Sequence, residues 1–206
     1  PLGVIDFHGS PIYLASETYD KLWISNLTGY MSNIFIISAP SGCGKTSLVR
    51  ELCQTYSFLE QTVSYTTRTI RSGEVDGQDY HFISKDEFIE NKKNNKFIES
   101  QNVYDNFYGT TYESINEILA SGKDAILEID YKGMLLIKSK IPSSQSIYIL
   151  PPSIEELEKR LFDRGLDSDE VIKKRVSRAK DELRYVKFAD YTVMNDNFAD
   201  ATKSLK

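Results

Sequence analysis

The feature that most constrains this chain is a short loop between an apolar run and a helical stretch. The loop is Ala39-Pro40-Ser41-Gly42-Cys43-Gly44-Lys45-Thr46, which follows Ile34-Phe35-Ile36-Ile37 and leads into residues 46–56. An apolar run of this length is typical of a buried parallel strand. The loop satisfies the pattern G-x-x-x-x-G-K-[ST] at every position but the first, where Ala39 replaces glycine. A strand, such a loop and a helix in this order predict a phosphate-binding loop.

The residue types in this loop suit a polyphosphate. Glycines let successive backbone N–H groups curl around an anion without a Cβ in the way. Lys45 would bring a positive charge to the β- and γ-phosphates, Thr46 would offer a hydroxyl to Mg²⁺, and the helix dipole would favour the same anion. Cys43 lies near a helix N-terminus, where the pKa of a thiol can fall, or else is a small filler. The alternative interpretation is a Gly-Lys-Thr turn that only caps a helix.

The same alternation of strand and helix returns later in the chain. Strands are predicted at residues 125–129, 146–150 and 191–194, and a helical stretch follows each of the first two. Strands that alternate with helices predict an α/β fold with a parallel sheet. Residues 60–112 differ, because they are short Tyr- and Thr-rich pieces with turn signals and one small helix opening at Ser84. This segment is predicted to be an inserted subdomain.

Composition and charge exclude several classes of protein. The chain has 206 residues, 40% of them hydrophobic and 27% charged, which suits one globular core. No apolar run approaches the ~18 residues of a membrane span, so no membrane partner is expected. The net charge of -5 argues against a nucleic-acid partner, because such surfaces need a positive excess. Cys43 and Cys53 are the only cysteines, which favours a reducing, cytoplasmic location.

The ends of the chain are predicted to differ from its body. Residues 1–31 carry no signal-peptide pattern and are expected to be an N-terminal extension or a non-native leader, with Met31 as a candidate native start. Residues 32–206 are expected to form the functional domain.

A second candidate site lies in the insertion. Arg68 and Arg71 stand three residues apart in the hydroxyl-rich stretch from Ser64 to Glu74, and Gly77-Gln78-Asp79-Tyr80 follows. Guanidinium groups and hydroxyl donors match phosphate oxygens, so this composition suits a phosphate clamp. A polar surface loop with two solvated arginines is the alternative, since exposed arginine is common.

This stretch resembles the GMP-binding signature of guanylate kinases. Further segments resemble that family in the same order: Phe97-Ile98-Glu99, Tyr108-Gly109-Thr110, Glu128-Ile129-Asp130, Ile149-Leu150-Pro151-Pro152, Arg160-Leu161, Arg164-Gly165, Arg175 and Asn195-Asp196. The resemblance spans roughly residues 34–196. It implies a P-loop NTPase-type parallel sheet flanked by helices, with a core at 32–60 and 113–206, a GMP-binding insertion at about 61–112 and a helical lid at about 155–187. The last two are expected to move when nucleotides bind. The family usually has a further helix near its C-terminus, and the chain stops at Lys206 inside the expected start of that helix.

The resemblance also implies a reaction and the residues that serve it. Such an enzyme transfers the γ-phosphoryl group of Mg-ATP to GMP, and by extension to dGMP. The residues implied for ATP are Ser41, Gly42, Cys43, Gly44, Lys45, Thr46, Ser47, Asn195 and Asp196, with Thr46 on the metal. Those implied for GMP are Ser64, Arg68, Arg71, Tyr80, Glu99, Tyr108, Thr110 and Asp130. The catalytic set is Lys45, Arg68, Arg160, Arg164 and Arg175.

Selectivity for guanine would follow from one carboxylate. Glu99 would accept hydrogen bonds from guanine N1–H and from the exocyclic amine, whereas adenine presents an acceptor at that ring position. Thr110 would bond the guanine O6 edge. The alternatives are a solvent-facing Glu99, an Asp130 that only caps a strand, and an ordinary salt-bridged helix face for the three later arginines.

Two other functions are compatible with this pattern. Guanylate-kinase-like domains of scaffold proteins bind peptides, but they commonly lack a working phosphate loop, and this chain has Lys45 and Thr46. A related kinase with a ribose phosphate acceptor could share the loop and the lid. Glu99 with Thr110 favours a guanine base instead. A homodimer is left open.

Overall fold

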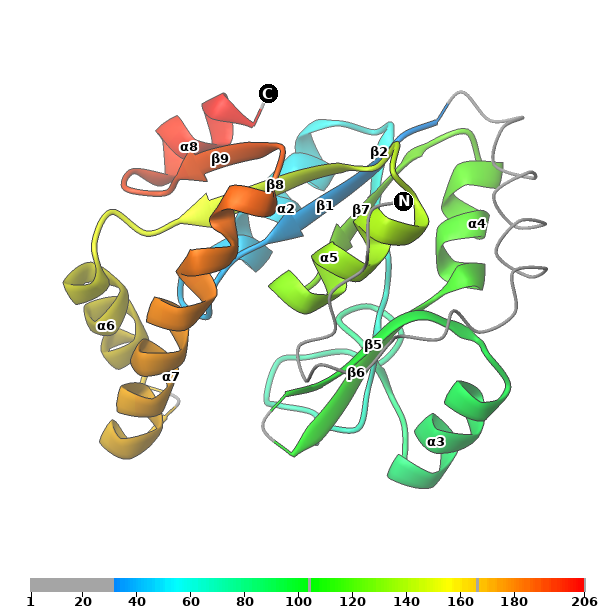
Figure 1. Cartoon of the computed structure of the whole chain (residues 1–206), viewed down its shortest axis with the longest axis horizontal. Helices are drawn as coiled ribbons and strands as arrows, with labels where there is room; N and C mark the ends of the chain where they lie inside the picture. Colours follow the sequence, from blue (N-terminus) through cyan, green and yellow to red (C-terminus); the bar gives the residue numbers. More distant parts are fainter. Residues whose placement is uncertain (1–31, 104, 166, 206) are drawn as a thin grey trace, which may run out of the picture. The chain divides into compact units, whose positions relative to one another are not determined.

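The computed structural model describes residues 32–103, 105–165 and 167–205 (Figure 1). The expectation of an N-terminal extension at residues 1–31 lies outside the described residues. Residues 32–206 cluster as one compact unit.

A five-stranded parallel sheet forms the centre of this unit. Its strand order is β2-β7-β1-β8-β9, and every pair of neighbours is parallel. The strands are β1 (Ile34–Ser38), β2 (Leu59–Gln61), β7 (Asp124–Glu128), β8 (Gln145–Leu150) and β9 (Tyr191–Met194). The predicted parallel α/β fold is confirmed. Because the carboxyl ends of parallel strands meet at one edge of a sheet, the residues that follow β1, β7 and β8 are brought together there.

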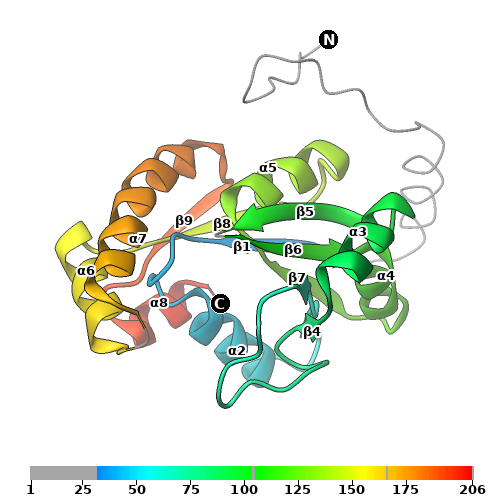
Figure 2. The same cartoon turned by 90° about the horizontal axis from the view of Figure 1, so that it is seen from below.

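Helices cover both faces of the sheet. Figure 2 shows α2 and α8 against one face and α5 against the other. Their bounds are Lys45–Thr55 for α2, Phe198–Ser204 for α8 and Tyr131–Lys140 for α5. A further helix of this unit is α4 (Tyr112–Ala120). The main hydrophobic core joins strands β1, β7, β8 and β9 to residues of α2, α6, α7 and α8. Ala39, which replaces the glycine of the loop pattern, is buried in this core, so its methyl group packs against apolar neighbours.

A second sheet and a short helix make up the insertion. The sheet has the order β4-β3-β6-β5 and is mostly antiparallel. Its elements are β3 (Tyr65–Thr66), β4 (His81–Phe82), α3 (Lys85–Lys93), β5 (Phe97–Val103) and β6 (Asn106–Thr111). Ser84 caps α3 by accepting a hydrogen bond from the Glu87 N–H, as the spacing of the two residues predicts. Stacked Phe88 and Phe97 rings, 4.4 Å apart between centroids, tie α3 to this sheet.

The region predicted as a lid contains two helices in a hairpin. They are α6 (Ile154–Asp163) and α7 (Asp169–Glu182), followed by the 3-10 helix η1 (Leu183–Phe188). Ser153 caps α6 through the Glu156 N–H. Leu157 and Leu161 of α6 and Ile172 and Val176 of α7 are buried and belong to the main hydrophobic core. Within the described ranges, each helix is too short or too polar to cross a lipid bilayer.

Candidate active site

A cleft of about 480 Å³ opens beside the carboxyl ends of β1 and β7. The phosphate loop, the inserted sheet and the α6–α7 hairpin all contribute to its walls. Of the residues predicted for the site, it is lined by Ser41, Gly42, Cys43, Gly44, Lys45, Thr46, Ser47, Ser64, Arg71, Tyr80, Glu99, Tyr108, Asp130, Arg160, Arg164 and Arg175. The fold thus gathers in one place side chains that are up to 134 positions apart in the sequence.

The phosphate loop has the backbone that anion binding needs. Gly42 and Gly44 have φ angles of 92° and 84°, a region that residues with a Cβ rarely adopt. Among the described residues, no side chain caps the N-terminus of α2. The first N–H groups of α2 are therefore left for a ligand, where the helix dipole favours a negative charge.

The two polar side chains at the start of α2 are held by the strand beside them. Lys45 Nζ donates to the Ile129 carbonyl at 3.1 Å. The Thr46 hydroxyl donates to Glu128 Oε1 at 2.6 Å, and Glu128 Oε2 accepts from Gln61 at 3.1 Å. Residues 128 and 129 stand at the end of β7, next to β1 in the sheet. Their roles were not predicted from the sequence, although an acidic residue at the end of a strand beside such a loop is a recognisable signal.

The oxygen donors at this point fit Mg²⁺. Mg²⁺ prefers hard oxygen ligands and keeps several waters or phosphate oxygens, so it needs only one or two protein ligands. Thr46 and Glu128 offer a hydroxyl and a carboxylate that already lie 2.6 Å apart at the mouth of the phosphate loop. Within the described residues, no three His, Cys, Asp or Glu side chains form a larger metal cluster. The donor set therefore suits a metal that arrives with a nucleotide.

Cys43 has the environment of a filler. It is completely buried in the hydrophobic core, and this burial raises the pKa of its thiol to about 12. The nearby Lys45 and Arg160 charges oppose this rise but do not overcome it. The Cys43 side chain is thus protonated at neutral pH, and only its backbone faces the phosphate site.

Glu99 forms the floor of the acceptor side of the cleft. It is 4% exposed on β5, opposite Thr110 of β6, whose hydroxyl donates to Glu99 Oε1 at 2.8 Å. Ser64 Oγ lies 3.0 Å from the same Thr110 hydroxyl. Burial raises the pKa of Glu99 to about 7, although the bond from Thr110 opposes the rise. Thr110 is itself buried and does not line the cleft, but it contacts Glu99 and Ser64, which both do.

The predicted arginine clamp is only partly in the cleft. Arg71 is exposed and lines it, whereas Arg68 does not. The Arg68 guanidinium forms two parallel bonds with Glu74, at 2.8 and 2.9 Å, and lies 5.5 Å from the centre of the Tyr80 ring. Tyr80 meets Tyr108 edge to face at 5.9 Å, and burial raises the pKa of Tyr80. Arg68 thus braces the loop that carries Arg71 and Tyr80.

Arg178 of α7, which was not predicted from the sequence, connects this helix to Asp130. Asp130 Oδ1 caps α5 by accepting from the Gly133 N–H at 2.9 Å, and its Oδ2 lies 3.8 Å from Arg178 Nη2. Arg178 Nε also donates to Glu182 at 2.6 Å. Arg178 and Glu182 both line the cleft, and burial raises the pKa of Glu182. Arg178 and Glu182 are spaced i, i+4 on a highly charged helix, which is typical of an ion pair on the surface, so the sequence did not indicate that they line the cleft.

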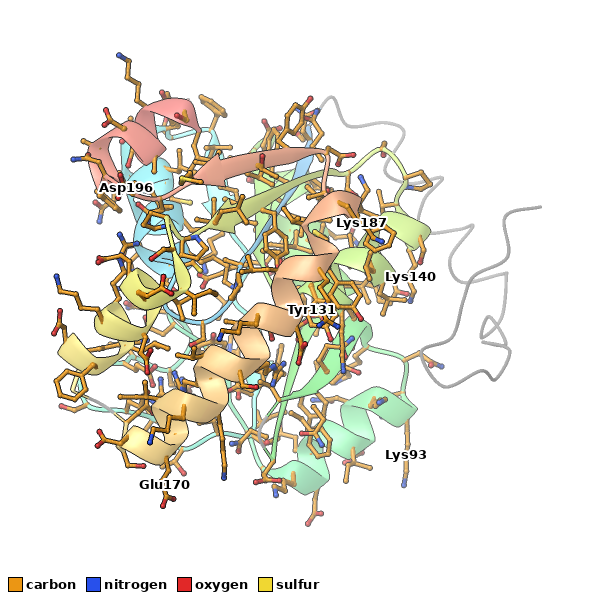
Figure 3. All side chains as sticks on the ribbon, turned by 60° about the vertical axis from the view of Figure 1, so that its left-hand side comes forward. Lys93, Tyr131, Lys140, Glu170, Lys187 and Asp196 are labelled. Carbon is orange, nitrogen blue, oxygen red and sulfur yellow. The ribbon has the colours of Figure 1, made fainter. Side chains whose placement is uncertain are left out.

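The three predicted lid arginines reach the cleft from the two helices of the hairpin. Arg175 of α7 donates to Ser41 Oγ at 3.2 Å and pairs with Asp167 at 3.1 Å. Arg160 of α6 donates to the carbonyl oxygens of Asn195 and Asp196, at 2.8 and 3.2 Å. Arg164 is exposed at the C-terminus of α6 and lines the cleft. Figure 3 shows the α7 side chains along the face of this hairpin.

Asn195 and Asp196, predicted beside ATP, do not line the cleft. Asn195 is 5% exposed and its side-chain amide donates to the Cys43 carbonyl at 2.8 Å. Asp196 bonds to Arg160 through its backbone oxygen.

The arrangement joins a cradle for a polyphosphate to a pocket with a buried carboxylate, and five arginines line the space they share. A site of this kind can bind two phosphorylated ligands at once and stabilise the charge on a group passing between them. The fold and the site together define a P-loop phosphotransferase.

Comparison with known proteins gives the family. The family model described as guanylate kinase matches residues 31–206. A guanylate kinase of Pseudomonas fluorescens (strain Pf0-1) is 43% identical over 180 residues, which is 87% of this chain and 87% of that protein. One from Buchnera aphidicola subsp. Schizaphis graminum is 46% identical over 175 residues, 84% of each chain. The crystal structure of guanylate kinase from Anaplasma phagocytophilum superimposes with a TM-score of 0.71 at 28% identity, over 85% of this chain and 83% of that one. This chain belongs to the guanylate kinase family and is a kinase.

Proposed function

We propose that this chain transfers the γ-phosphoryl group of Mg-ATP to GMP, and also to dGMP, giving ADP and GDP. The observation that carries the proposal is the single cleft that contains both Lys45 of the phosphate loop and the buried carboxyl group of Glu99. The first suits a triphosphate, and the second suits a base with adjacent N–H donors.

GMP would bind on the side of the inserted sheet. The guanine N1–H and amine would both donate to the Glu99 carboxylate, and the Thr110 hydroxyl would turn from Glu99 to the O6 edge. Ser64, Arg71, Tyr80 and Tyr108 would hold the GMP phosphate, together with Arg68, which also bonds Glu74. Adenine would bring a lone pair against the Glu99 carboxylate, and this repulsion explains the expected selectivity.

ATP would bind with its phosphates in the loop from Ser41 to Ser47 and with the segment 195–196 beside the adenine. Thr46 would hold Mg²⁺, and Glu128 would supply a further oxygen next to it. When bound, Mg²⁺ would neutralise charge on the β- and γ-phosphates. Lys45 would turn from the Ile129 carbonyl to the same phosphates.

The reaction needs positioning and charge stabilisation from the protein, and no covalent chemistry of its own. A phosphate oxygen of GMP attacks the γ-phosphorus, the bond to the β–γ bridging oxygen breaks, and ADP leaves. Arg160, Arg164 and Arg175 would move over the transferring group as the α6–α7 hairpin closes. Asp130 would lie between the GMP side and the metal side of the cleft.

The test is ADP production from Mg-ATP by the purified full chain, with GMP, dGMP, AMP, UMP and ribose 1,5-bisphosphate as separate acceptors. We expect turnover with GMP and dGMP to be far above that with the other three, and Lys45→Ala to abolish it. Glu99→Gln, which keeps the volume of the side chain, should lower turnover with GMP much more than it affects binding of ATP. Equal turnover with AMP, or the use of the ribose phosphate alone, would refute the proposal.

The location and assembly of the enzyme are part of the same proposal. Both cysteines are free thiols, which suits a cytoplasmic protein. A homodimer stays a prediction, which light scattering of the purified chain would check.

A further inference from the structure

Asn195 lies where three parts of the ATP site meet. It is the first residue after β9, and its backbone N–H donates to the Leu150 carbonyl at the end of β8, at 2.8 Å. Its backbone carbonyl accepts from Arg160 of α6, also at 2.8 Å. Its side-chain amide donates to the carbonyl of Cys43 in the phosphate loop at 2.8 Å. Only 5% of the surface of Asn195 is exposed, and both its backbone N–H and its backbone carbonyl are hydrogen-bonded.

The contact between Asn195 and the loop is very close. A Cβ atom on Gly44 would lie 2.4 Å from Asn195 Nδ2, far inside the distance that two such atoms tolerate. Gly44 therefore has a reason to be glycine besides its φ angle of 84°. The amide of Asn195 packs directly on the peptide bond between Cys43 and Gly44.

That peptide bond determines where one of the loop's donors points. A trans peptide is planar, so the Cys43 carbonyl and the Gly44 N–H point in opposite directions. The hydrogen bond from Asn195 holds the carbonyl on the buried side, and this turns the Gly44 N–H away from Asn195. A cradle for phosphate needs its N–H groups turned inward and its carbonyls turned outward.

We propose that the Asn195 side chain is a positioning residue for the phosphate loop, which it keeps in its anion-binding conformation, and that it does not read the adenine base. The inference rests on the proposed function in one respect: it assumes that the loop binds the phosphates of ATP. It follows that Asn195 contributes to the binding of any polyphosphate, with or without a base. A residue that contacts adenine would contribute to the binding of ATP alone.

Inorganic tripolyphosphate separates these two roles because it has no base. Its binding and that of ATP are to be measured by calorimetry on the full chain, for the wild type, Asn195→Ala and Asn195→Asp. We expect Asn195→Ala to raise the Kd of both ligands by the same factor, on the order of tenfold, the effect of one buried hydrogen bond. Asn195→Asp should raise both further, because a carboxylate oxygen would face the Cys43 carbonyl.

Asn116→Asp is the matched control. Asn116 lies on α4, none of whose residues, all of them described, lines the cleft, so the same change of charge there should leave both Kd values unaltered. A loss of ATP binding with unchanged tripolyphosphate binding would overturn the proposal, and so would unchanged binding of both ligands by folded Asn195 variants. Neither readout uses GMP or turnover, so failure of the proposed function would be seen separately.

Asn195 is buried, so its variants could unfold; thermal unfolding followed by circular dichroism would show this. In that case the side-chain amide resonance of Asn195 in the wild-type chain gives a second test. We expect it to shift when tripolyphosphate saturates the site. A resonance that responds to ATP but not to tripolyphosphate would refute the proposal.

Discussion

Glu99 is a buried acid whose ionisation decides what the acceptor pocket can bind. Burial raises its pKa to about 7, so below that pH the carboxyl group is protonated and cannot accept from both guanine donors. The KM for GMP should therefore rise about tenfold for each pH unit below 7 and level off above it. Steady-state kinetics between pH 5.5 and 8.5 would check this. Glu99→Gln should remove this component of the pH dependence, and a KM for GMP that follows pH equally in both proteins would contradict the assignment.

The same carboxyl group should make the free enzyme less stable at higher pH. Its folded pKa of about 7 lies above the ordinary value of 4.5, so its contribution to stability is fully present below pH 4.5 and is lost as the pH rises through 7. At 1.36 kcal/mol per pKa unit, the loss is about 3 kcal/mol. We expect Glu99→Gln to gain stability relative to the wild type between pH 5 and pH 8 in urea unfolding. An unchanged difference would show that Glu99 ionises freely.

Gly133 permits helix α5 to pass close to Glu99. A Cβ at this position would lie 3.1 Å from Glu99 Oε2 and 3.2 Å from the Ile129 side chain. Gly133→Ala should therefore displace the carboxylate and raise the KM for GMP about tenfold, the cost of one misplaced hydrogen bond. The KM for ATP should stay the same, because the phosphate loop is on other elements. A gain in helix stability without any change in the KM for GMP would show that the site adapts to the methyl group.

At the scale of elements, an ion pair between Arg68 and Glu74 braces the loop between β3 and β4. Arg68 and Glu74 are 12% and 20% exposed and form two parallel hydrogen bonds, and Glu74 also accepts from the Arg71 N–H. Glu74→Ala should loosen this loop and raise the KM for GMP about tenfold, with less effect on the KM for ATP. Glu74→Gln, which can keep one of the bonds, should be milder.

A double-mutant cycle tests whether Arg68 and Glu74 act together. In the Arg68→Ala background, Glu74→Ala should add little, because its partner is already gone. Effects on the KM for GMP that multiply in the double variant would show that Glu74 acts on the site without Arg68.

The sequence was sufficient for the elements whose signals are local. Apolar runs located β1, β7, β8 and β9 to within one residue, and the spacing of Ser84 and Glu87 located the start of α3. The glycine-rich pattern located the phosphate loop because the glycines and the lysine that such a loop needs lie next to one another in the sequence.

Contacts between distant elements could not be read from the chain. Thr46 bonds Glu128 across 82 positions, and Asn195 bonds Cys43 across 152. The spacing of apolar residues predicts helices and strands, but it does not indicate which distant side chains will form a hydrogen bond. The contact of Arg68 was not apparent from the sequence for the same reason: its guanidinium lies against Glu74 and does not line the cleft. Composition indicates that an arginine can bind a phosphate. Only the folded structure shows whether a carboxylate of the same chain, here that of Glu74, already binds the arginine.

At the scale of the whole kinase unit, the cleft walls belong to parts joined mainly through the central sheet. The inserted sheet with α3 supplies Glu99 and Tyr108, whereas the α6–α7 hairpin supplies Arg160 and Arg175 (Figure 1). These parts carry groups that attract the phosphates of different nucleotides. Binding of both ligands should therefore draw them together and exclude water, which would otherwise hydrolyse ATP.

Closure can be measured with fluorescent labels on the two walls. Lys93 at the end of α3 and Glu170 at the start of α7 are exposed and lie on separate arms in Figure 3, so Lys93→Cys and Glu170→Cys accept a donor and an acceptor dye. Cys53→Ser removes the half-buried thiol, and Cys43 stays unlabelled because it is buried with a pKa of about 12.

Energy transfer should rise most when GMP and ADP are bound together, because each nucleotide alone attracts the arginines of only one wall. GMP alone should move the inserted sheet and ADP alone the hairpin, so each should give a smaller increase. Lys45→Ala in the same labelled chain is the control for the donor side, since it should weaken the response to ADP and spare the response to GMP. An unchanged distance with both sites saturated would mean that the cleft is already closed, and the arginines would then have to reach the phosphates by side-chain rotation alone.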